Sequence, residues 1–517
     1  MRGERSVVGR NLNAALHERR AVFLSKAEIM SGCHCQGGYR PVTEIRLRQD
    51  RIAACDTKLT VSRNMAWTNW RYWMSFHRIA LLLVFVISSV NSQEQNTHIL
   101  FTNVHVFDGV NEQRIENANV LVENNLIAVV STEPIETADA LIIDGGGRTL
   151  MPGLTDSHVH LMINDAPHIS IYEKPWPYVG AQAVAGAEAM LMRGFTTVRD
   201  VGGPVVGLKD AIDQGLVKGP RILPSGAFIS QTSGHGDLET SSAKLSPYFT
   251  GIPDKSTLFG WGFVADGVPE VQKAAREVLR TGATQIKVMA GGGVSSFFDP
   301  LDTTQYTLEE LKAIVTEAEN WGTYVAAHAY TDTAVRMCIE AGIKSIEHGP
   351  FLTEKTLKLM AKEGVWFSPQ AYLFGMTPED LRIVGTPAEP KMRQVNQDSD
   401  TVMKLARELG VKVAWGTDLF GPLEKQALQS LEFKARTRYF SNAEILRQAT
   451  STNAELFKLS GLRHPYREGE IGVIQEGAYA DIILVDGNPL EDIELMLDPA
   501  ESFSLIMKNG VIYKNKL

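Results

Sequence analysis

Two histidines in the segment LTDSHVHL, residues 154–161, have a spacing that suits metal binding. His158 and His160 lie two residues apart, and side chains at positions i and i+2 of a β-strand point to the same side of the strand. Two imidazoles on one face near the end of a strand can hold one metal ion. Alternatively, one histidine packs in the core and the other is solvated. The pair alone leaves both interpretations open.

Four further polar residues lie in short apolar segments that have the composition of buried strands. They are Lys287 in TQIKVMAGGG, His328 in YVAAHAY, His348 in IKSIEHG and Asp418 in VKVAWGTD. A buried ammonium is rarely left alone, so Lys287 needs a carboxylate partner, a role as a Schiff-base nucleophile, or conversion to a carbamate that bridges two metals. A single core histidine is more often simply hydrogen-bonded, and an aspartate can cap a helix. Together, however, six such groups at strand ends indicate a metal site.

The elements that must position these residues alternate between strands and helices. Between about residues 151 and 463, apolar strand-like segments are separated by helical segments, several of which end in glycine, a frequent helix stop. Eight strands can be counted in this region. This number suits a (β/α)8 barrel of the TIM type, in which chemistry takes place at the carboxyl ends of the strands. A doubly wound open sheet is the alternative, but the first helix lacks a glycine-rich phosphate-binding motif.

The regions on either side of the expected barrel have a different pattern. Residues 93–150 and residues 464–517 contain short β-like runs that are separated by Asn and Gly turns. We expect the two regions to pair into one small β-sandwich that is built from both ends of the mature chain. The predicted fold class is therefore α/β, with a barrel over residues 151–463 and this smaller sandwich.

The first 92 residues differ in charge from the rest of the chain. They contain 14 Lys+Arg and 6 Asp+Glu, whereas the whole chain has a net charge of −9. Residues 93–517 are therefore strongly acidic, which argues against nucleic-acid binding, since nucleic-acid-binding proteins present a basic face. Three of the four cysteines also lie in the first 92 residues. Only Cys338 remains in the rest, so an intrachain disulfide framework is not expected there.

Residues 74–92, MSFHRIALLLVFVISSVNS, have the layout of a secretory signal peptide. A short basic start precedes the apolar run Ile79–Ile87, and small residues follow before an expected cleavage at Gln93. The apolar run is too short for a stable membrane-spanning helix, so we expect no stable membrane insertion, and an uncleaved anchor is the alternative. Residues 1–73 are interpreted as an over-extended or disordered leader upstream of the true start at Met74. The expected location is secreted or periplasmic.

Taken in order, the motifs of this sequence resemble those of the amidohydrolase superfamily. The motifs are DSHVHL, QIKVMAGGG, AHAYT, SIEHG and GTD. They are most similar to its imidazolonepropionase-like branch, which includes Xaa-Pro dipeptidases, arginine/lysine carboxypeptidases and ochratoxin-hydrolysing amidases. The resemblance extends from about Thr97 to the C-terminus, including GAYADIILVDGNPL, and does not cover residues 1–92.

The resemblance implies two divalent metal ions held by named residues. His158 and His160, together with Asp418, would bind the more buried ion. His328 and His348 would bind the second ion. Zinc suits such imidazole and oxygen ligands, although manganese or cobalt could substitute for it.

The resemblance also implies distinct roles for Lys287 and Asp418. Lys287, carboxylated by carbon dioxide, would give one oxygen to each ion, because an anionic carbamate can bridge dications that an ammonium would repel. A hydroxide shared by the two ions would attack the substrate carbonyl near neutral pH. Asp418 would take the proton and then deliver it to the departing amine.

Two residues are candidates for contacts with the substrate. His235 lies in the glycine-rich loop QTSGHGD, where it could polarise the carbonyl or bind a carboxylate. A histidine that makes only local contacts in the loop is an equally open interpretation. Tyr330 lies two residues after His328 and can therefore face the same cavity. Three aromatic residues could line an apolar pocket or simply pack in the core: Trp261, Phe297 and Phe298.

These observations favour a secreted binuclear amidohydrolase that cleaves an amide bond in small molecules, either dipeptides or N-acyl amino acids. The alternative is a mononuclear cyclic-amide hydrolase or a deaminase of a heterocycle, like imidazolonepropionase. In those relatives the lysine position is usually not a ligand, so Lys287 favours the binuclear enzyme. A non-catalytic scaffold would typically have lost metal ligands, and here all six positions are filled. We also expect assembly into a homo-oligomer.

Overall fold

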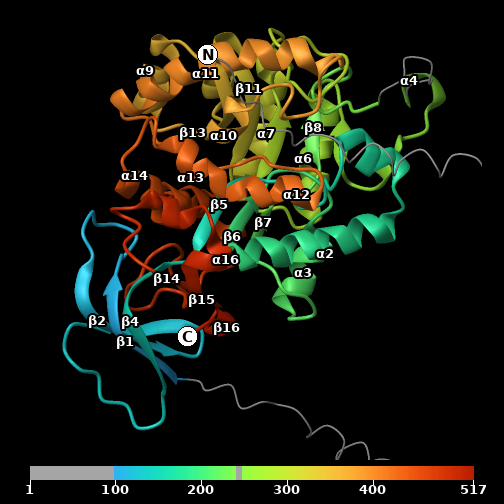
Figure 1. Cartoon of the computed structure of the whole chain (residues 1–517). Coiled ribbons are helices and arrows are strands. Elements are labelled where there is room, and N and C mark those ends of the chain that lie inside the picture. The colour runs from blue at the N-terminus through green and yellow to red at the C-terminus, as the bar shows by residue number, and fades with distance from the viewer. Residues whose placement is uncertain (1–97, 240–246) are drawn as a thin grey trace, which may run out of the picture. The chain divides into compact units, whose positions relative to one another are not determined.

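The computed structural model describes residues 98–239 and 247–517 (Figure 1). The leader and the signal peptide predicted for residues 1–73 and 74–92 lie outside the described residues. None of the helices within the described ranges has both the length and the apolar character needed to cross a membrane.

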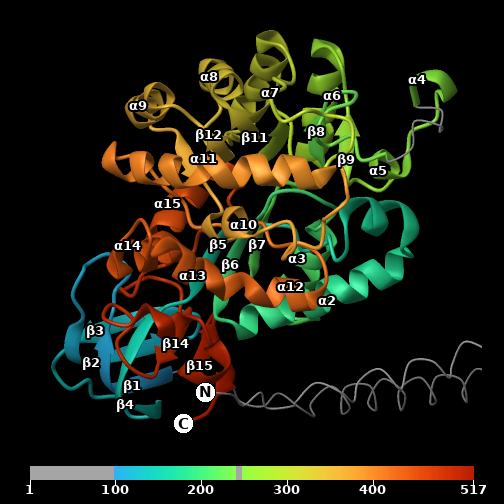
Figure 2. The same cartoon turned by 45° about the horizontal axis from the view of Figure 1, so that its top comes forward.

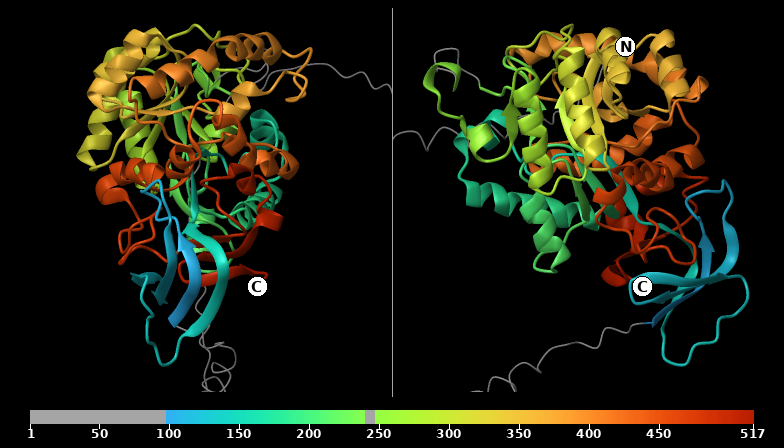
Figure 3. Two further views of the ribbon diagram at one scale, coloured as in Figure 1. Left: turned by 60° about the vertical axis from the view of Figure 1, so that its left-hand side comes forward. Right: turned by 180° about the vertical axis from the view of Figure 1, so that it is seen from behind.

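Strands from both ends of the described chain form one seven-stranded sheet, as Figure 3 shows. At its centre, β1 (His98–Val106) pairs in parallel with β4 (Leu141–Pro152), and β4 pairs antiparallel with β14 (Ile482–Val485). The order of the strands is β16-β15-β14-β4-β1-β2-β3. The two regions thus pair as expected, while their arrangement as a two-layered sandwich stays a prediction. The other strands are β2 (Ile115–Glu123), β3 (Leu126–Ser131), β15 (Phe503–Lys508) and β16 (Val511–Asn515).

The remaining strands are parallel and alternate with helices, which confirms the α/β class. One sheet has three strands in the order β5-β6-β7, and the other has six in the order β13-β12-β11-β10-β8-β9. Every pairing within these two sheets is parallel. The three-stranded sheet contains β5 (Leu154–Val159), β6 (Phe195–Asp200) and β7 (Arg221–Pro224). The six-stranded sheet contains β8 (Phe228–Ser230), β9 (Gly262–Val264), β10 (Ile286–Met289), β11 (Val325–Thr331), β12 (Ser345–Phe351) and β13 (Trp366–Ser368).

Backbone hydrogen bonds connect the two parallel sheets through residues 412–418. Phe367 N in β13 donates to Lys412 O at 2.8 Å, and Ser157 N in β5 donates to Trp415 O at 2.9 Å. This segment therefore lies between β13 and β5, where the eighth predicted strand is expected.

The longer helices cover the parallel strands from outside (Figure 2). Their ends follow local sequence signals: α7 begins with a capping box between Thr307 and Glu310, and α8 and α9 end at Gly342 and Gly364. Both glycines have a left-handed φ, of 99° and 66°, which residues with a Cβ rarely adopt.

The long helices are α2 (Trp176–Met192), α3 (Val206–Asp213), α6 (Val268–Arg280), α7 (Leu308–Asn320), α8 (Asp332–Ala341), α9 (Glu354–Glu363) and α11 (Ala388–Glu408). The short α-helices are α4 (Pro247–Thr250), α5 (Lys255–Leu258), α10 (Ala371–Gly375), α12 (Leu423–Gln426), α13 (Leu431–Arg436), α14 (Asn442–Arg447), α15 (Asn453–Phe457) and α16 (Pro499–Ser502). The π and 3-10 turns are η1 (Ile169–Glu173), η2 (Ala427–Ser430), η3 (Gln448–Thr452), η4 (Lys458–Arg463) and η5 (Ile493–Met496).

The structure distinguishes the three aromatic residues for which the sequence allowed either core packing or a pocket. Trp261 is fully buried in the large core between the parallel strands and the helices. Phe297 and Phe298 are 37% and 43% exposed, so neither packs in this core. Cys338 is buried and is the free cysteine of the described residues.

Candidate metal centre

The six residues predicted as metal ligands lie in the parallel strands or just after them. His158 lies in β5, Lys287 in β10, His328 in β11 and His348 in β12, while His160 directly follows β5 and Asp418 ends the segment 412–418. Asp418 is central: its Oδ1 lies 3.5 Å from His158 Nε2 and 3.3 Å from His160 Nε2, and its Oδ2 lies 4.0 Å from His348 Nδ1. The rings of His348 and His328 have centroids 4.5 Å apart. Ligand atoms of three of these residues all lie within 4.8 Å of one another: His158, His348 and Asp418. The structure thus brings the four histidines and Asp418 together, while their role as metal ligands stays a prediction.

The backbone is strained at two of these residues. His348 and Asp418 have positive φ angles of 77° and 52°. A residue with a Cβ adopts such a conformation only when the surrounding structure enforces it, and this strain is common at functional sites. Asp418 N donates to His158 O at 2.8 Å, which holds the strained turn against β5.

Hydrogen bonds on the outer side of each histidine decide which ring nitrogen faces the centre. His158 Nδ1 donates to Glu347 Oε2 at 2.8 Å, His160 Nδ1 to Gly202 O at 3.1 Å, and His348 Nδ1 to Gln370 Oε1 at 2.7 Å. In these three rings, Nε2 is left for a ligand. In His328 the two ring nitrogens have the opposite roles: Nε2 donates to Gly292 O at 3.1 Å, so Nδ1 is the nitrogen left for a ligand. Metal-binding histidines usually have one nitrogen fixed in this way. 

Two buried atoms at the centre lack a hydrogen-bond partner among the residues that the structure describes. They are His158 Nε2 and Asp418 Oδ1. Leaving a buried polar atom unsatisfied is unfavourable by about 1–3 kcal/mol, so such atoms normally point to a ligand. Imidazole nitrogens and carboxylate oxygens are the donor set of zinc and related ions. The residues present therefore fit a divalent cation.

Lys287 is almost completely buried in β10 beside these groups. Burial lowers the pKa of Lys287 to about 8, although the charges of Glu347 and Asp418 raise it. No hydrogen bond or ion pair to its Nζ occurs within residues 98–239 and 247–517. A buried amine with a lowered pKa is partly uncharged near neutral pH, which is the form that can react with carbon dioxide.

The buried carboxylate of Glu347 supports the centre, and the sequence reasoning missed it. Besides His158, Glu347 accepts hydrogen bonds from Arg199 Nη2 at 2.7 Å and from Ser345 Oγ at 2.6 Å. Burial alone would raise the pKa of the Glu347 carboxyl, but the Arg199 guanidinium and His158 hold it well below its usual range. The available signals were two charged residues inside apolar strands, FTTVRD and SIEHG.

Two further buried aspartates anchor the backbone around the ligands. Asp156 accepts hydrogen bonds from His158 N at 3.0 Å and from Thr417 Oγ1 at 2.6 Å, and thus joins the two segments that carry ligands. Asp200 Oδ2 accepts from Leu161 N at 2.7 Å. Burial raises the pKa of both aspartates to about 6.

The two residues predicted to contact substrate pack against His328. The His235 ring stacks on His328 with centroids 4.0 Å apart, and Tyr330 stacks on it at 4.8 Å. His235 Nδ1 lies 2.7 Å from Ser296 Oγ and 3.4 Å from Asp299 Oδ2, so its Nε2 remains for a ligand. Burial raises the pKa of the Tyr330 hydroxyl, which therefore stays protonated as a hydrogen-bond donor.

The GGG segment after β10 is shaped by close contacts with His235 and by Lys391. A Cβ on Gly293 would lie 2.1 Å from His235 Cε1, so only glycine fits there. Lys391 Nζ donates to three carbonyl oxygens of this loop, those of Gly293 at 2.8 Å, Ser296 at 3.0 Å and Asp299 at 2.7 Å. The lysine therefore fixes the loop that orients His235.

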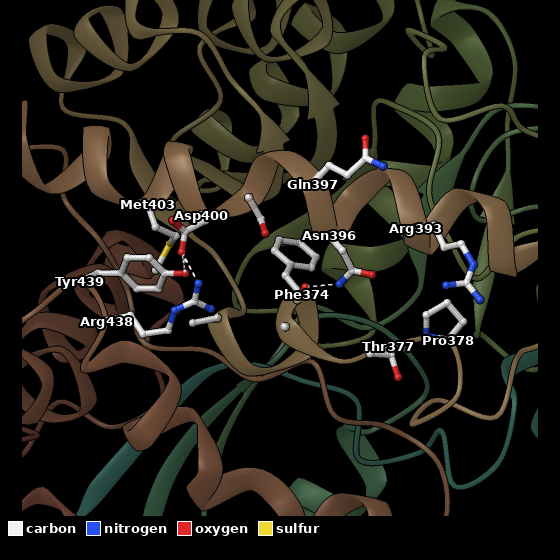
Figure 4. A pocket seen from close by; sticks show the side chains of 13 residues that line it. Phe374, Thr377, Pro378, Arg393, Asn396, Gln397, Asp400, Met403, Arg438 and Tyr439 are labelled. Carbon is white, nitrogen blue, oxygen red and sulfur yellow. Dashed lines mark hydrogen bonds and ion pairs between the residues drawn. The ribbon is translucent and has the colours of Figure 1, made fainter.

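A cavity of about 420 Å³ lies between α10, α11 and the segment after α13 (Figure 4). Phe374 lines it and also contacts Tyr330 and His348, with ring centroids 6.4 and 6.3 Å apart. Several of its polar residues are already paired, as in the hydrogen bond from Tyr439 OH to Asp400 Oδ1 at 2.9 Å. None of the predicted site residues lines this cavity, which lies behind the wall of the metal centre.

The parallel α/β fold and this cluster define the class of protein, and the comparison with protein families agrees. Residues 149–514 match the amidohydrolase family. The chain belongs to this family and is a hydrolase that acts on amide bonds.

Individual relatives cover most of the chain. Ochratoxinase of Aspergillus niger is 31% identical over 411 residues, which are 77% of this chain and 83% of the relative. The structure of a prolidase complexed with N-methylphosphonate-L-proline is 36% identical, covers 81% of this chain and 100% of its own, and has a TM-score of 0.75. The structure of a Xaa-Pro dipeptidase with methionine bound in the active site is 28% identical, with the same coverage and a TM-score of 0.72.

Proposed function

We propose that the protein is a binuclear metal-dependent amidohydrolase that cleaves the amide bond of dipeptides or N-acyl amino acids. The observation that carries the proposal is that two buried atoms inside a cluster of four histidines, His158 Nε2 and Asp418 Oδ1, have no hydrogen-bond partner among the described residues. The relatives support this substrate class, since a prolidase and a Xaa-Pro dipeptidase are among them.

In this proposal each metal ion has its own ligands. His158, His160 and Asp418 would hold one ion, and His328 and His348 would hold the other. Zinc is the ion that this donor set suits best. When bound, the two ions would activate water near neutral pH and polarise the substrate carbonyl.

Lys287, carboxylated on Nζ, would complete the ligand set. Its burial and its lack of a hydrogen-bond acceptor within the described ranges support this role, because a bare ammonium there would stand next to two cations.

The protein's own groups move the proton and hold the substrate. Burial alone would raise the pKa of the Asp418 carboxyl, but His158 and His160 hold it below its usual range. Asp418 is therefore ionised at neutral pH, accepts the proton of the attacking water and passes it to the departing amine nitrogen. His235 Nε2 and the Tyr330 hydroxyl can donate hydrogen bonds to the carbonyl oxygen, where negative charge develops.

The proposal is tested by counting metals while screening substrates. The protein is purified with zinc and bicarbonate, its metal content is measured by plasma mass spectrometry, and release of free amino acids is followed over a library of dipeptides and N-acyl amino acids. We expect about two zinc ions per chain and cleavage of some members of the library. One ion without amide cleavage would instead favour the mononuclear deaminase or cyclic-amide hydrolase. No bound metal would contradict the proposal.

We also propose that the parallel strands close into a barrel over residues 151–463, with residues 412–418 as the last strand. The hydrogen bonds of this segment to β13 and β5 support closure. The two end regions, residues 93–150 and 464–517, would curl into the sandwich. One shared core supports this arrangement, because it contains Phe101 of β1 and Leu484 of β14.

Secretion and assembly complete the proposal. We propose that residues 74–92 direct the protein out of the cytoplasm and are cleaved before Gln93. Mass-spectrometric mapping of the native N-terminus tests this, because retention of residues 74–92 would favour a membrane anchor. We further propose a homo-oligomer, which light scattering after size-exclusion chromatography would detect.

A further inference from the structure

A lysine at the edge of the metal centre has no role in the function described so far. Lys425 lies in α12, in the loop that follows Asp418. The loop is tied back to the centre, because Gly421 N donates to Ile163 O at 2.8 Å, in the segment that follows the histidine pair of β5. Lys425 is therefore held on the same side of the molecule as the metal ligands.

One aromatic ring separates the Lys425 ammonium from a predicted metal ligand. Nζ lies 4.9 Å from the centre of the Phe420 ring, and this ring meets the His160 ring edge to face with centroids 6.1 Å apart. Lys425 is half-buried, and burial lowers its pKa while the Asp418 charge raises it. The ammonium is thus partly desolvated and close enough to the centre to interact with a bound substrate.

The Lys425 ammonium lacks an anionic partner in the part of the chain that the structure describes. Two other half-buried lysines do have partners: Lys174 Nζ lies 3.7 Å from Asp165 Oδ2, and Lys391 in α11 binds three carbonyls. A desolvated ammonium is unfavourable unless it is paired, so an unpaired one beside an active centre favours a ligand that brings the anion.

We propose that Lys425 binds the α-carboxylate of the amino acid that hydrolysis releases. This inference rests on the proposed function and narrows it, because substrates with a free carboxylate next to the scissile amide would bind most tightly. A dipeptide or an N-acyl amino acid carries one, whereas a peptide amide or a neutral cyclic amide does not. The charge-assisted hydrogen bond would act mainly in binding, since the carboxylate keeps its charge throughout the reaction.

The test compares acids with their amides. The wild type and three variants, Lys425→Met, Lys425→Gln and Lys425→Arg, are assayed in the zinc-loaded full chain with Ala-Pro, N-acetyl-L-phenylalanine and the C-terminal amide of each. We expect Lys425→Met and Lys425→Gln to raise KM for the acids about ten- to a hundredfold with little change in kcat. For the amides, KM should stay as in the wild type. Lys425→Arg should restore most of the loss, and Lys174→Met is the matched control that should leave the ratio of acid to amide unchanged.

Three results would overturn the assignment. An equal loss for acids and amides would mean that Lys425 acts on Asp418 rather than on the substrate. A fall in kcat alone would mean the same, and no change in any variant would mean that the ammonium has no ligand in the reaction.

A binding measurement separates this inference from the proposed function. If the wild type cleaves no member of the panel, the proposed function fails. Calorimetric titration of the zinc-loaded protein with N-acetyl-L-phenylalanine and with its amide still tests Lys425. Preference for the acid should be present in the wild type and lost in Lys425→Met and Lys425→Gln. Equal preference in all three proteins would overturn the inference, and thermal unfolding of each variant verifies that it is folded.

Discussion

Replacing Glu347 by glutamine should weaken metal binding and destabilise the fold together. Glutamine has nearly the shape of glutamate, so Glu347→Gln removes a charge without opening a cavity. In the wild type this carboxylate is fully buried and accepts hydrogen bonds from His158 Nδ1 at 2.8 Å and Arg199 Nη2 at 2.7 Å. The substitution leaves the buried Arg199 guanidinium without its counter-charge and makes the His158 ring a poorer electron donor.

The size of both effects follows from these contacts. Breaking a buried ion pair by removing one charge lowers the free energy of unfolding by about 3–5 kcal/mol. Loss of the carboxylate behind a metal-binding histidine lowers metal affinity by about 10–100-fold. The first effect is measured by urea unfolding of the metal-free protein, and the second by competition for zinc with a chelator of known affinity.

Asp481→Asn is the matched control for the Glu347 variant. Asp481 forms a buried ion pair with Arg221, and each side chain is 4% exposed, but the pair lies where β7 approaches the seven-stranded sheet, away from the metal ligands. This variant should lose stability and keep its zinc affinity. If Glu347→Gln also kept its zinc affinity, Glu347 would be a structural charge only. If Glu347→Gln lost neither stability nor zinc affinity, the inferred role of the buried pair would be wrong.

Three further predictions concern the base, a glycine and a titrating histidine. Asp418→Asn should keep the fold and lower kcat by about 10²–10⁴-fold, measured on the best substrate of the library, because an amide cannot accept the proton. Gly293→Ala should lower kcat/KM without loss of bound zinc, because its Cβ would meet His235 at 2.1 Å and displace the ring. The pKa of His464 is lowered to about 4 by burial. The unfolded chain therefore binds the proton first, so stability should fall as pH drops from about 6.5 to 4, and His464→Asn should flatten this dependence in urea unfolding.

Each of these predictions has a contradicting outcome. Near-normal turnover by Asp418→Asn would exclude it as the base. Unchanged kcat/KM in Gly293→Ala would mean that the position of His235 does not matter for the reaction. An unaltered pH dependence in His464→Asn would assign the acid sensitivity to other buried groups.

The sequence was sufficient to predict that the histidines and Asp418 lie together, while their roles as ligands stay predictions. Residues such as His158, His160 and Lys287 attract attention because polar groups in buried strands need a reason to be there. Parallel strands align their carboxyl ends, so local patterns were enough to predict that distant residues converge. The α/β class followed from the same alternation of strands and helices.

Contacts that depend on tertiary packing could not be predicted from the sequence. Glu347 supports His158 from a strand 189 positions away, and Lys391 reaches the loop at Gly293 from 98 positions away. No local pattern encodes such pairs, since each is created only when the strands and helices come together. The lack of an anionic partner for Lys425 among the described residues could not be predicted from the sequence either, because the tertiary structure determines whether a carboxylate lies near its ammonium.

The position of β4 in the seven-stranded sheet has a consequence during synthesis on the ribosome. Thr149 at the end of β4 hydrogen-bonds to Gly487, 338 positions later in the chain. At about 5–20 residues per second, this partner emerges on the order of half a minute afterwards. Until then one edge of β4 has free backbone groups beside the apolar Leu150 and Met151, a surface that can pair with other nascent chains. Loss of the last residues would therefore expose a strand at the middle of the sheet, and premature termination should favour aggregation.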